Sequence, residues 1–260
     1  MTLSRSVADV VRRRAPNAAT AFWLYLQLRR QDRELARASG ERRSPRDLVR
    51  QTPDGRLLEI VGHDLFDVRV HSGPMTASQK LDEIVPLLER VERLRPQRVC
   101  EIGSSAGGTL YLLTRVSPDD AVIVSVDHAL PDYTRRARSR MARGRQRVVG
   151  IEGDSHSEET KRRVIQAVEG EPLDFLFIDG DHSYEGVRAD YELYAPLVRA
   201  GGMVALHDVN PDFRTSRGVE TPSISGDVPH YWSELKERHR CEELIAEPGQ
   251  DGYGIGIVYV

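Results

Sequence analysis

The chain has 260 residues, of which 39% are apolar and 30% are charged. This composition is too polar for a membrane-embedded protein and too apolar for a disordered one, so it predicts a globular protein. The cysteines are Cys100 and Cys241 alone. Two cysteines exclude a disulfide framework and a four-cysteine zinc site, and they indicate a reducing compartment.

The formal net charge of −3 is unevenly distributed along the chain. Residues 1–50 contain twelve arginines and five acidic residues, a balance of +7, so the remainder carries −10. An acidic main body argues against nucleic-acid binding, whereas the basic arm stays open as a docking element. The longest apolar run, residues 18–28, is about half of the roughly 20 residues that span a membrane. We therefore expect a cytoplasmic protein without a transmembrane segment.

Residues 1–74 are expected to form a helical or irregular extension. Segment 4–40 predicts one or two helices broken near Pro16, with an apolar stripe on one side. Such a stripe fits packing on the protein's own domain or on a second copy, or a helix at a membrane surface. Short apolar runs at 57–61 and 65–70 predict strands or an irregular cover. The extension is thus expected to be a cover or an oligomer interface.

A regular alternation of elements begins near residue 75. Thr76 and Gln79 have the spacing of a capping box, which predicts the start of a helix. Expected strands then alternate with expected helices, and two final strands predict a closing hairpin. Residues 75–260 therefore predict a doubly wound α/β domain with a mostly parallel, seven-stranded sheet and a C-terminal antiparallel hairpin. The expected strands are 98–102, 121–126, 147–151, 173–178, 203–206, 241–245 and 253–260, and the expected helices are 106–116, 131–143, 156–169 and 184–199.

Polar and glycine residues follow the first three expected strands, where ligands bind in open α/β sheets. A turn with the spacing G-x-x-x-G-G begins at Gly103, which departs from the dinucleotide fingerprint G-x-G-x-x-G. Asp127 comes 24 residues later, a position suited to a ribose diol. Asp154 and Ser155 offer polar groups for an adenine edge. Each acid alone could be a helix cap, but together they predict an adenosine site.

These residues, with Glu101 before the turn and the terminal hairpin, resemble the class I S-adenosylmethionine-dependent methyltransferases. The resemblance covers residues 98–260, with 75–97 as an extension of it. It implies that Gly103 and Gly107 face the methionine part of the cofactor and that Asp127 faces the ribose hydroxyls. The full set implied to bind the cofactor is Met75, Glu101, Gly103, Ser104, Gly107, Thr109, Asp127, Asp154 and Ser155.

Asp179 and Asp208 end the fourth and fifth expected strands, 29 residues apart. One strand–helix–strand unit brings them side by side, where two carboxylates suit Mg²⁺, unless they are caps or a proton-sharing pair. The region resembles metal-dependent O-methyltransferases that act on sugars in antibiotic biosynthesis, and the cephalosporin-pathway methyltransferase group. That resemblance implies Asp179, His207 and Asp208 as metal ligands and His182 as general base. His207 departs from the acid usual there, so either it only flanks the site or the ion differs, for example Mn²⁺.

The sequence thus predicts an enzyme that uses S-adenosylmethionine and a divalent metal to methylate a hydroxyl of a sugar or glycosylated natural product. The polar segment 209–230 is expected to be a substrate lid. Relatives imply a homo-oligomer. The alternatives are a catechol-like acceptor, a lipid-linked glycan reached through the basic arm, an accessory or hydroxylase role, and a non-catalytic binding protein of the same fold.

Overall fold

The computed structural model describes residues 44–51, 58–60, 76–105, 107–129 and 141–260. Most of the expected N-terminal helices, the run 65–70 and most of the expected helix 131–143 lie outside these residues. Among the described residues, no helix combines the length and the apolarity that crossing a bilayer requires.

A seven-stranded mixed sheet forms the centre of the molecule, in the order β6-β5-β4-β7-β8-β10-β9. The five strands β4 to β8 run parallel, and β10 is antiparallel to both β8 and β9. This arrangement confirms the predicted sheet and its closing hairpin. The strands are β4 (Arg98–Ile102), β5 (Val122–Asp127), β6 (Arg147–Glu152), β7 (Leu173–Ile178), β8 (Val198–His207), β9 (Cys241–Leu244) and β10 (Ile255–Tyr259).

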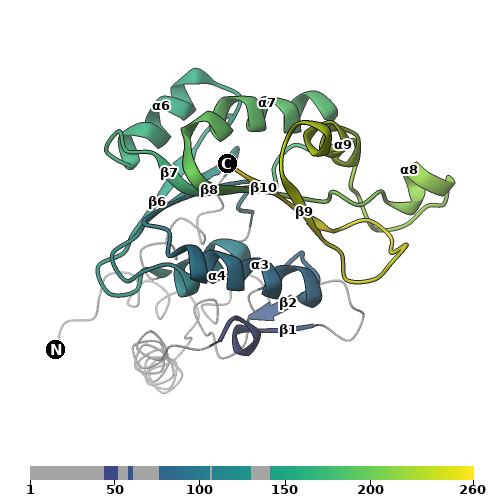
Figure 1. Ribbon diagram of the computed structural model, residues 1–260, viewed down its shortest axis with the longest axis horizontal. Coiled ribbons are helices and arrows are strands. Elements are labelled where there is room, and N and C mark those ends of the chain that lie inside the picture. Colours follow the sequence, from purple (N-terminus) through teal and green to yellow (C-terminus); the bar gives the residue numbers. More distant parts are fainter. Residues whose placement is uncertain (1–43, 52–57, 61–75, 106, 130–140) are drawn as a thin grey trace, which may run out of the picture.

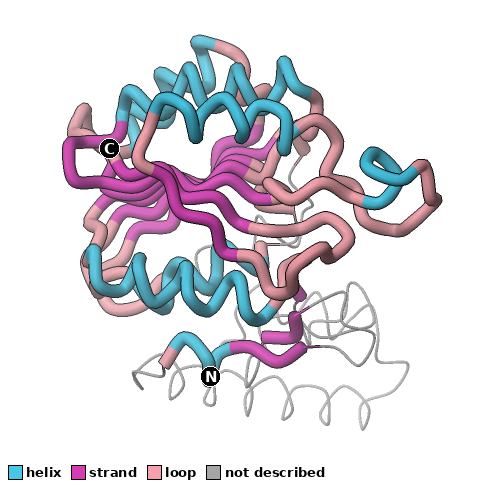
Figure 2. The backbone as a smooth tube through the Cα atoms, turned by 45° about the vertical axis from the view of Figure 1, so that its right-hand side comes forward, coloured by secondary structure: helices cyan, strands magenta, loops and turns pink. Residues whose placement is uncertain are grey.

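Helices cover both faces of this sheet (Figures 1 and 2). Helices α3 (Leu81–Leu94) and α4 (Gly108–Val116) lie on one face, and α6 (Glu158–Ala167), α7 (Tyr184–Tyr194) and α9 (Val228–Arg238) lie on the other. Each face has its own apolar core, because buried parallel strands present apolar side chains on both sides. The short helix α8 (Phe213–Arg217) lies beyond the end of the sheet.

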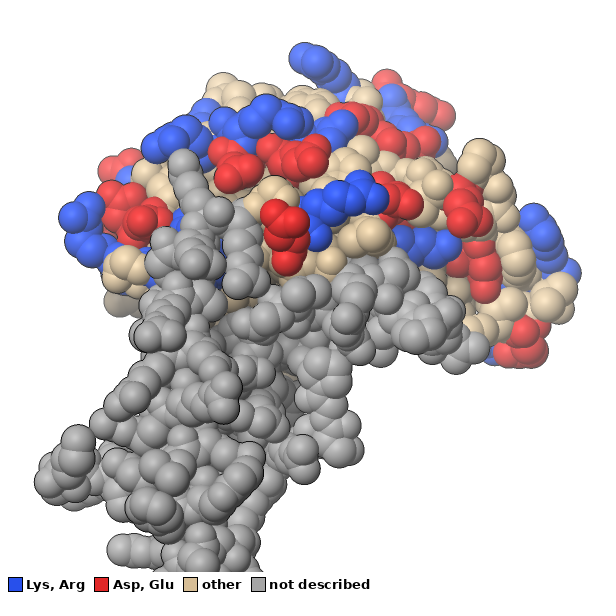
Figure 3. Space-filling model, turned by 90° about the horizontal axis from the view of Figure 1, so that it is seen from below, with Lys and Arg blue, Asp and Glu red and all other residues tan. Residues whose placement is uncertain are grey.

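A small three-stranded antiparallel sheet lies beside α3 and α4. Its strands are β1 (Val49–Gln51), β2 (Leu58–Ile60) and β3 (Thr76–Ala77), and a 3₁₀ turn at Pro45–Leu48 precedes them. The strand β2 confirms one of the two readings of the run 57–61. On the face shown in Figure 3, basic and acidic side chains are interspersed over the described residues.

Several predicted boundaries differ from the structure, and β8 begins at Val198 where the sequence predicted a strand from residue 203. Thr76 does not cap a helix, because Thr76–Ala77 pairs with β2, and α3 begins at Leu81 with Lys80 as its N-cap. The expected helix 184–199 ends at Tyr194, because Pro196 cannot continue the helical hydrogen bonding and β8 already begins at Val198.

The strand order places a topological switch point at β4, which has β5 on one side and β7 on the other. The chain runs from β4 through β5 to β6 at one edge and then returns to β7. Ligands of open α/β sheets bind at the carboxyl ends of the strands at such a point. A ligand site is therefore expected at the carboxyl ends of β4, β5, β6 and β7.

Candidate functional site

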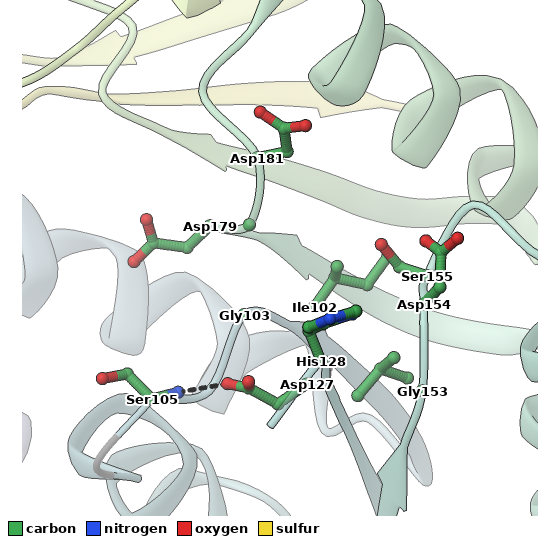
Figure 4. Close-up of a pocket in the computed structure, with 12 residues that line it drawn as sticks. Ile102, Gly103, Ser105, Asp127, His128, Gly153, Asp154, Ser155, Asp179 and Asp181 are labelled. Atoms are coloured by element: carbon green, nitrogen blue, oxygen red, sulfur yellow. Dashed lines mark hydrogen bonds between the residues drawn. The ribbon is translucent and has the colours of Figure 1, made fainter. Parts of the chain in front are cut away.

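A pocket of about 420 Å³ opens at these carboxyl ends (Figure 4). Its volume falls within the range of pockets that hold small molecules. Of the residues predicted to bind the cofactor, Gly103, Asp127, Asp154 and Ser155 line it. The complete lining among the described residues is Ile102, Gly103, Ser105, Val126, Asp127, His128, Gly153, Asp154, Ser155, Asp179, Gly180 and Asp181.

Gly103 allows the ends of β4 and β7 to approach each other. Its φ is +81°, and a Cβ there would lie 1.9 Å from the carbonyl oxygen of Asp179. The peptide N–H of Asp179 donates to the carbonyl oxygen of Ile102, 2.8 Å away, which fixes this close approach. A side chain at residue 103 would therefore push the end of β4 away from Asp179.

Asp127 ends β5 with its carboxylate held in place by backbone donors. Oδ2 accepts from the N–H of Ser105 at 2.7 Å, and Oδ1 accepts from the N–H of Ala129 at 3.1 Å. The first of these hydrogen bonds ties Asp127 to the glycine-rich turn across the pocket. A carboxylate accepts up to about four hydrogen bonds, so Asp127 retains capacity for ligand hydroxyls.

The far end of the pocket lies between the loops that follow β6 and β7. Oδ1 of Asp154 accepts from the N–H of His156 at 2.9 Å, and the carbonyl oxygen of Ser155 accepts from the hydroxyl of Tyr194 at 2.8 Å. Asp181 lies in the loop that follows β7, and a Cβ on Gly186 would lie 2.3 Å from its Cγ. The backbone N–H of Ser183 lowers the pKa of Asp181, which keeps it a hydrogen-bond acceptor.

The other residues predicted to bind the cofactor do not line this pocket. Glu101, Ser104 and Thr109 are buried, and Gly107 is the N-cap of α4 with φ +85°. Met75 lies outside the described residues. Sequence reasoning did not select the lining residues Ser105 and Asp181, although each is adjacent or close to a predicted residue.

A second cluster adjoins the pocket at Asp179. One ligand atom from each of Asp179, His182 and Asp208 lies within 4.8 Å of the others. The Nε2 of His182 is 3.7 Å from Oδ1 of Asp179 and 3.5 Å from Oδ2 of Asp208. Two carboxylates and one imidazole suit Mn²⁺ or another transition ion better than an all-oxygen site would. The donor set therefore fits a divalent cation.

His207 is buried and lies beside the carboxylates of Asp179 and Asp208. Its Nδ1 is 3.2 Å from Oδ1 of Asp179 and 3.0 Å from Oδ2 of Asp208. The structure thus brings together all four residues that the sequence assigned to the metal and the base. It places His182, which was expected to be the base, with the candidate ligand atoms, whereas His207 contacts both carboxylates.

Asp208 takes an unusual backbone conformation, with φ +61°. Neighbouring residues of a regular strand point to opposite faces. The left-handed conformation of Asp208, directly after β8, instead lets the side chains of His207 and Asp208 lie on the same side, near Asp179. Such conformations cost about 1–3 kcal/mol and concentrate at functional sites.

The charged groups of the cluster shift one another's pKa values. The carboxylate of Asp179, followed in effect by that of Asp208, raises the pKa of His182 to about 8 against the opposing effect of burial. Burial would lower the pKa of His207, but Asp208 and Asp179 outweigh it and raise that pKa well above its ordinary value. Burial would raise the pKa of Asp179, but the two histidines outweigh it and lower that pKa.

Segment 209–230, the expected lid, is tied to His182. The Nδ1 of His182 lies 2.8 Å from the carbonyl oxygen of Ile224, and the N–H of Asp227 donates to the carbonyl oxygen of His182 at 2.8 Å. Asp212 is buried in the same segment and accepts from the N–H groups of Thr215 and Ser225. The segment therefore has internal structure, including α8, and contacts the cluster directly.

Gln79 is the contact that sequence reasoning missed. Its side chain is buried, and its Nε2 donates to Oδ2 of Asp179 at 3.1 Å. Gln79 was interpreted as half of a capping box, so no local signal pointed to Asp179, 100 residues further along the chain.

Parts of the chain match known proteins in sequence. A family described as a methyltransferase domain matches residues 100–209. A stretch of 80 residues is 32% identical to an uncharacterized protein of Acanthamoeba polyphaga mimivirus, covering 31% of this chain and 35% of that protein. The chain therefore spans about a third of the length of this curated relative.

Solved structures resemble the described fold. An O-methyltransferase from Bacillus cereus in complex with SAH superposes with a TM-score of 0.52 at 20% identity, covering 66% of this chain and 78% of that one. The O-methyltransferase TomG from Streptomyces achromogenes, in complex with SAM, has a TM-score of 0.46 at 18% identity, covering 67% and 78%. The methyltransferase MycE of the mycinamycin pathway, in complex with Mg and SAH, has a TM-score of 0.46 at 20% identity, covering 67% and 49%.

The sheet order and the antiparallel C-terminal strands define the class of fold, and the family match covers residues 100–209. The described residues adopt the class I, Rossmann-like fold, which they share with the Bacillus cereus O-methyltransferase. This confirms the resemblance that the glycine-rich turn and the strand-end acids indicated.

Proposed function

We propose that the protein is an S-adenosylmethionine-dependent O-methyltransferase that works with a divalent cation. One observation carries the proposal: Asp179 both lines the strand-end pocket and belongs to the Asp179–His182–Asp208 cluster. A methyl donor in the pocket and an acceptor at the cluster would therefore meet at one side chain. Holding two reactants in this way contributes up to roughly 7–11 kcal/mol to catalysis.

The pocket residues divide into three roles in this proposal. The turn at Gly103 and the N-terminus of α4 behind Gly107 face the methionine part, and Asp127 accepts from the ribose hydroxyls. Asp154 and Ser155, joined by Asp181, bind the adenine end. Glu101, Ser104 and Thr109 are buried, and they stay proposed cofactor contacts from the sequence resemblance. We keep Met75 as a proposed cofactor contact from the sequence resemblance.

The cation would be held by Asp179 and Asp208, with Mg²⁺ or Mn²⁺ as the proposed ion. When bound, such an ion makes a nearby hydroxyl more acidic. The Nε2 of His182 faces both carboxylates, so it would either take the proton from the acceptor or complete the ligand set. His207 would be the third ligand of the original prediction, or it would hold the two carboxylates apart through Nδ1.

The acceptor is proposed to be a hydroxyl of a sugar or of a glycosylated natural product, with a catechol-like diol as the alternative. One aromatic ring borders the cluster, since the ring of Tyr253 lies 6.1 Å from that of His207, centroid to centroid. The Nζ of Lys80 lies 5.4 Å from the centroid of the Tyr253 ring. An aromatic face and an ammonium donor suit a hydroxyl-rich acceptor. Residues 1–74 are proposed as a cover or as the interface of a homo-oligomer.

The test is methyl transfer from labelled S-adenosylmethionine to a panel of sugars, glycosides and catechols, with and without EDTA. The double variant Asp179→Ala/Asp208→Ala should lose turnover, while calorimetry shows a dissociation constant for S-adenosylmethionine within about threefold of wild type. Undiminished turnover in EDTA or in the double variant would overturn the role of the cation. Failure of the wild-type protein to bind S-adenosylmethionine would leave a non-catalytic binding protein as the better description.

A further inference from the structure

The two carboxylate oxygens of Asp179 have different neighbours: Oδ1 faces the histidines of the cluster, and Oδ2 accepts a hydrogen bond from a neutral donor. Oδ1 faces His207 at 3.2 Å and His182 at 3.7 Å. Oδ2 accepts instead from Nε2 of Gln79 at 3.1 Å. Because a carboxylate is planar, fixing Oδ2 also fixes the direction in which Oδ1 points. The rotation of this side chain is thus determined from a part of the chain that lies before α3.

The amide of Gln79 is a specific donor. An ionised carboxylate can only accept, so the nitrogen of the amide must face Asp179. The side chain of Gln79 is 1% exposed, so water does not compete for this hydrogen bond. Among the described residues, the Oε1 of the same amide has no hydrogen-bond partner. A buried amide with one unused acceptor stabilises the fold poorly, which favours a role at the site.

Neutrality distinguishes Gln79 from the other groups around Asp179. His182 and His207 can gain a proton and a positive charge, whereas an amide orients Oδ2 without adding charge at any pH. Groups that orient metal-binding carboxylates in this way typically change metal affinity or activity by about 10–100-fold when they are lost.

We propose that Gln79 is a positioning residue for the cation site, holding Oδ2 of Asp179 so that Oδ1 stays directed at the cluster. This inference rests on the proposed function, because it assumes that Asp179 is a ligand. Gln79 lies two residues after β3 (Thr76–Ala77), so the small sheet contributes to the site of the methyltransferase domain through it.

The test measures Mn²⁺ binding by electron paramagnetic resonance and S-adenosylmethionine binding by calorimetry, on the full chain. Gln79→Leu removes the donor at similar volume, and Gln79→Met is the second variant should the first fail to fold. Either is expected to bind Mn²⁺ about 10–100-fold more weakly, with the affinity for S-adenosylmethionine within about threefold of wild type.

Gln146 provides the matched control. It is a buried glutamine whose Nε2 donates to the carbonyl oxygens of Thr114 and Pro118, before the amino end of β6 and away from the site. Gln146→Leu should reduce thermal stability without changing Mn²⁺ affinity. Mn²⁺ affinity within threefold of wild type in a folded Gln79 variant would overturn the positioning role alone. Absence of Mn²⁺ binding by the wild-type protein would overturn the cation site itself, and the positioning role with it.

Discussion

His182 donates its Nδ1–H to the carbonyl oxygen of Ile224, 2.8 Å away. A carbonyl oxygen can only accept, so this hydrogen bond assigns the proton of the neutral ring to Nδ1. The lone pair of the neutral imidazole is then on Nε2, which faces the carboxylates of Asp179 and Asp208. Both roles proposed for His182 need this lone pair. The segment after β8 therefore determines which ring nitrogen can accept a proton or bind a cation.

The first prediction concerns His182 itself. His182→Ala should lower kcat by roughly 10²–10⁴-fold if the ring takes the acceptor proton. Mn²⁺ affinity should then change little, whereas a ligand role requires it to fall together with kcat. The exposed His239, on the far end of α9, provides the control His239→Ala. A kcat within threefold of wild type, with unchanged Mn²⁺ affinity, would contradict both roles.

The second prediction tests the contact between His182 and the segment 209–230. A Cβ at Gly226 would lie 2.4 Å from the carbonyl oxygen of His182, and the φ of Gly226 is +56°. Gly226→Ala should therefore displace His182 and lower turnover by more than tenfold, as measured in steady-state assays with S-adenosylmethionine saturating.

Gly218 is the control for this experiment. Its φ is +66°, but a Cβ there would have no atom within 4 Å. Both alanine variants accept a left-handed backbone, at about 1–2 kcal/mol, and only Gly226→Ala also pushes against His182. Equal turnover in the two variants would show that the segment does not position the ring.

The strands were predictable because buried parallel strands are continuous apolar runs. The bounds of β4 and β7 match their predicted ranges, 98–102 and 173–178. The strand-end acids were predictable for the same reason, since Asp127 and Asp179 directly follow such runs or end them. Local pattern was sufficient wherever burial and chain direction alone decide where a residue lies.

The remaining features depend on contacts that local pattern does not encode. Gln79 and Asp179 are 100 residues apart, and a capping-box spacing at Thr76 was the stronger local signal. The arrangement of His207 and Asp208 depends on φ +61° at Asp208, which is uncommon for a residue with a Cβ. A regular strand would have turned one of the two side chains away from Asp179.

The third prediction concerns the ribose end of the pocket. Asp127→Ala should weaken binding of S-adenosylmethionine by about 10–150-fold, because hydrogen bonds to a charged group contribute about 1.5–3 kcal/mol. Calorimetry measures this directly. Asp120→Ala is the control, since Asp120 precedes the amino end of β5 and pairs at 3.3 Å with Arg145. An affinity for S-adenosylmethionine within threefold of wild type in Asp127→Ala would exclude Asp127 from the cofactor site.

The fourth prediction concerns stability against pH at Asp190, on α7. The carboxyl group is fully buried, with Oδ1 3.5 Å from Nε2 of His156, and Oδ2 lies close to Gly180 of the pocket. Burial raises the pKa of Asp190 to about 6, from about 3.8 when exposed, and the charges of Asp181 and Asp154 act in the same direction while His156 opposes them.

The sign follows from which state holds the proton. Below about pH 4 both folded and unfolded chains are protonated at Asp190, so the group costs nothing. Between about pH 4 and 6 the unfolded chain releases the proton while the folded chain retains it, so the free energy of unfolding falls as pH rises. Above about pH 6 the loss is complete, on the order of 3 kcal/mol for a shift of about two pKa units.

The side chain introduced by Asp190→Asn cannot ionise, so the free energy of unfolding of this variant does not fall for this reason as pH rises. The difference in unfolding free energy between the variant and wild type should shift in favour of the variant by up to about 3 kcal/mol from pH 4 to pH 7. Urea unfolding at a series of pH values measures it, with the pH dependence of all other groups cancelling in the difference. A difference that stays constant across this range would mean that Asp190 ionises equally in the folded and unfolded chains.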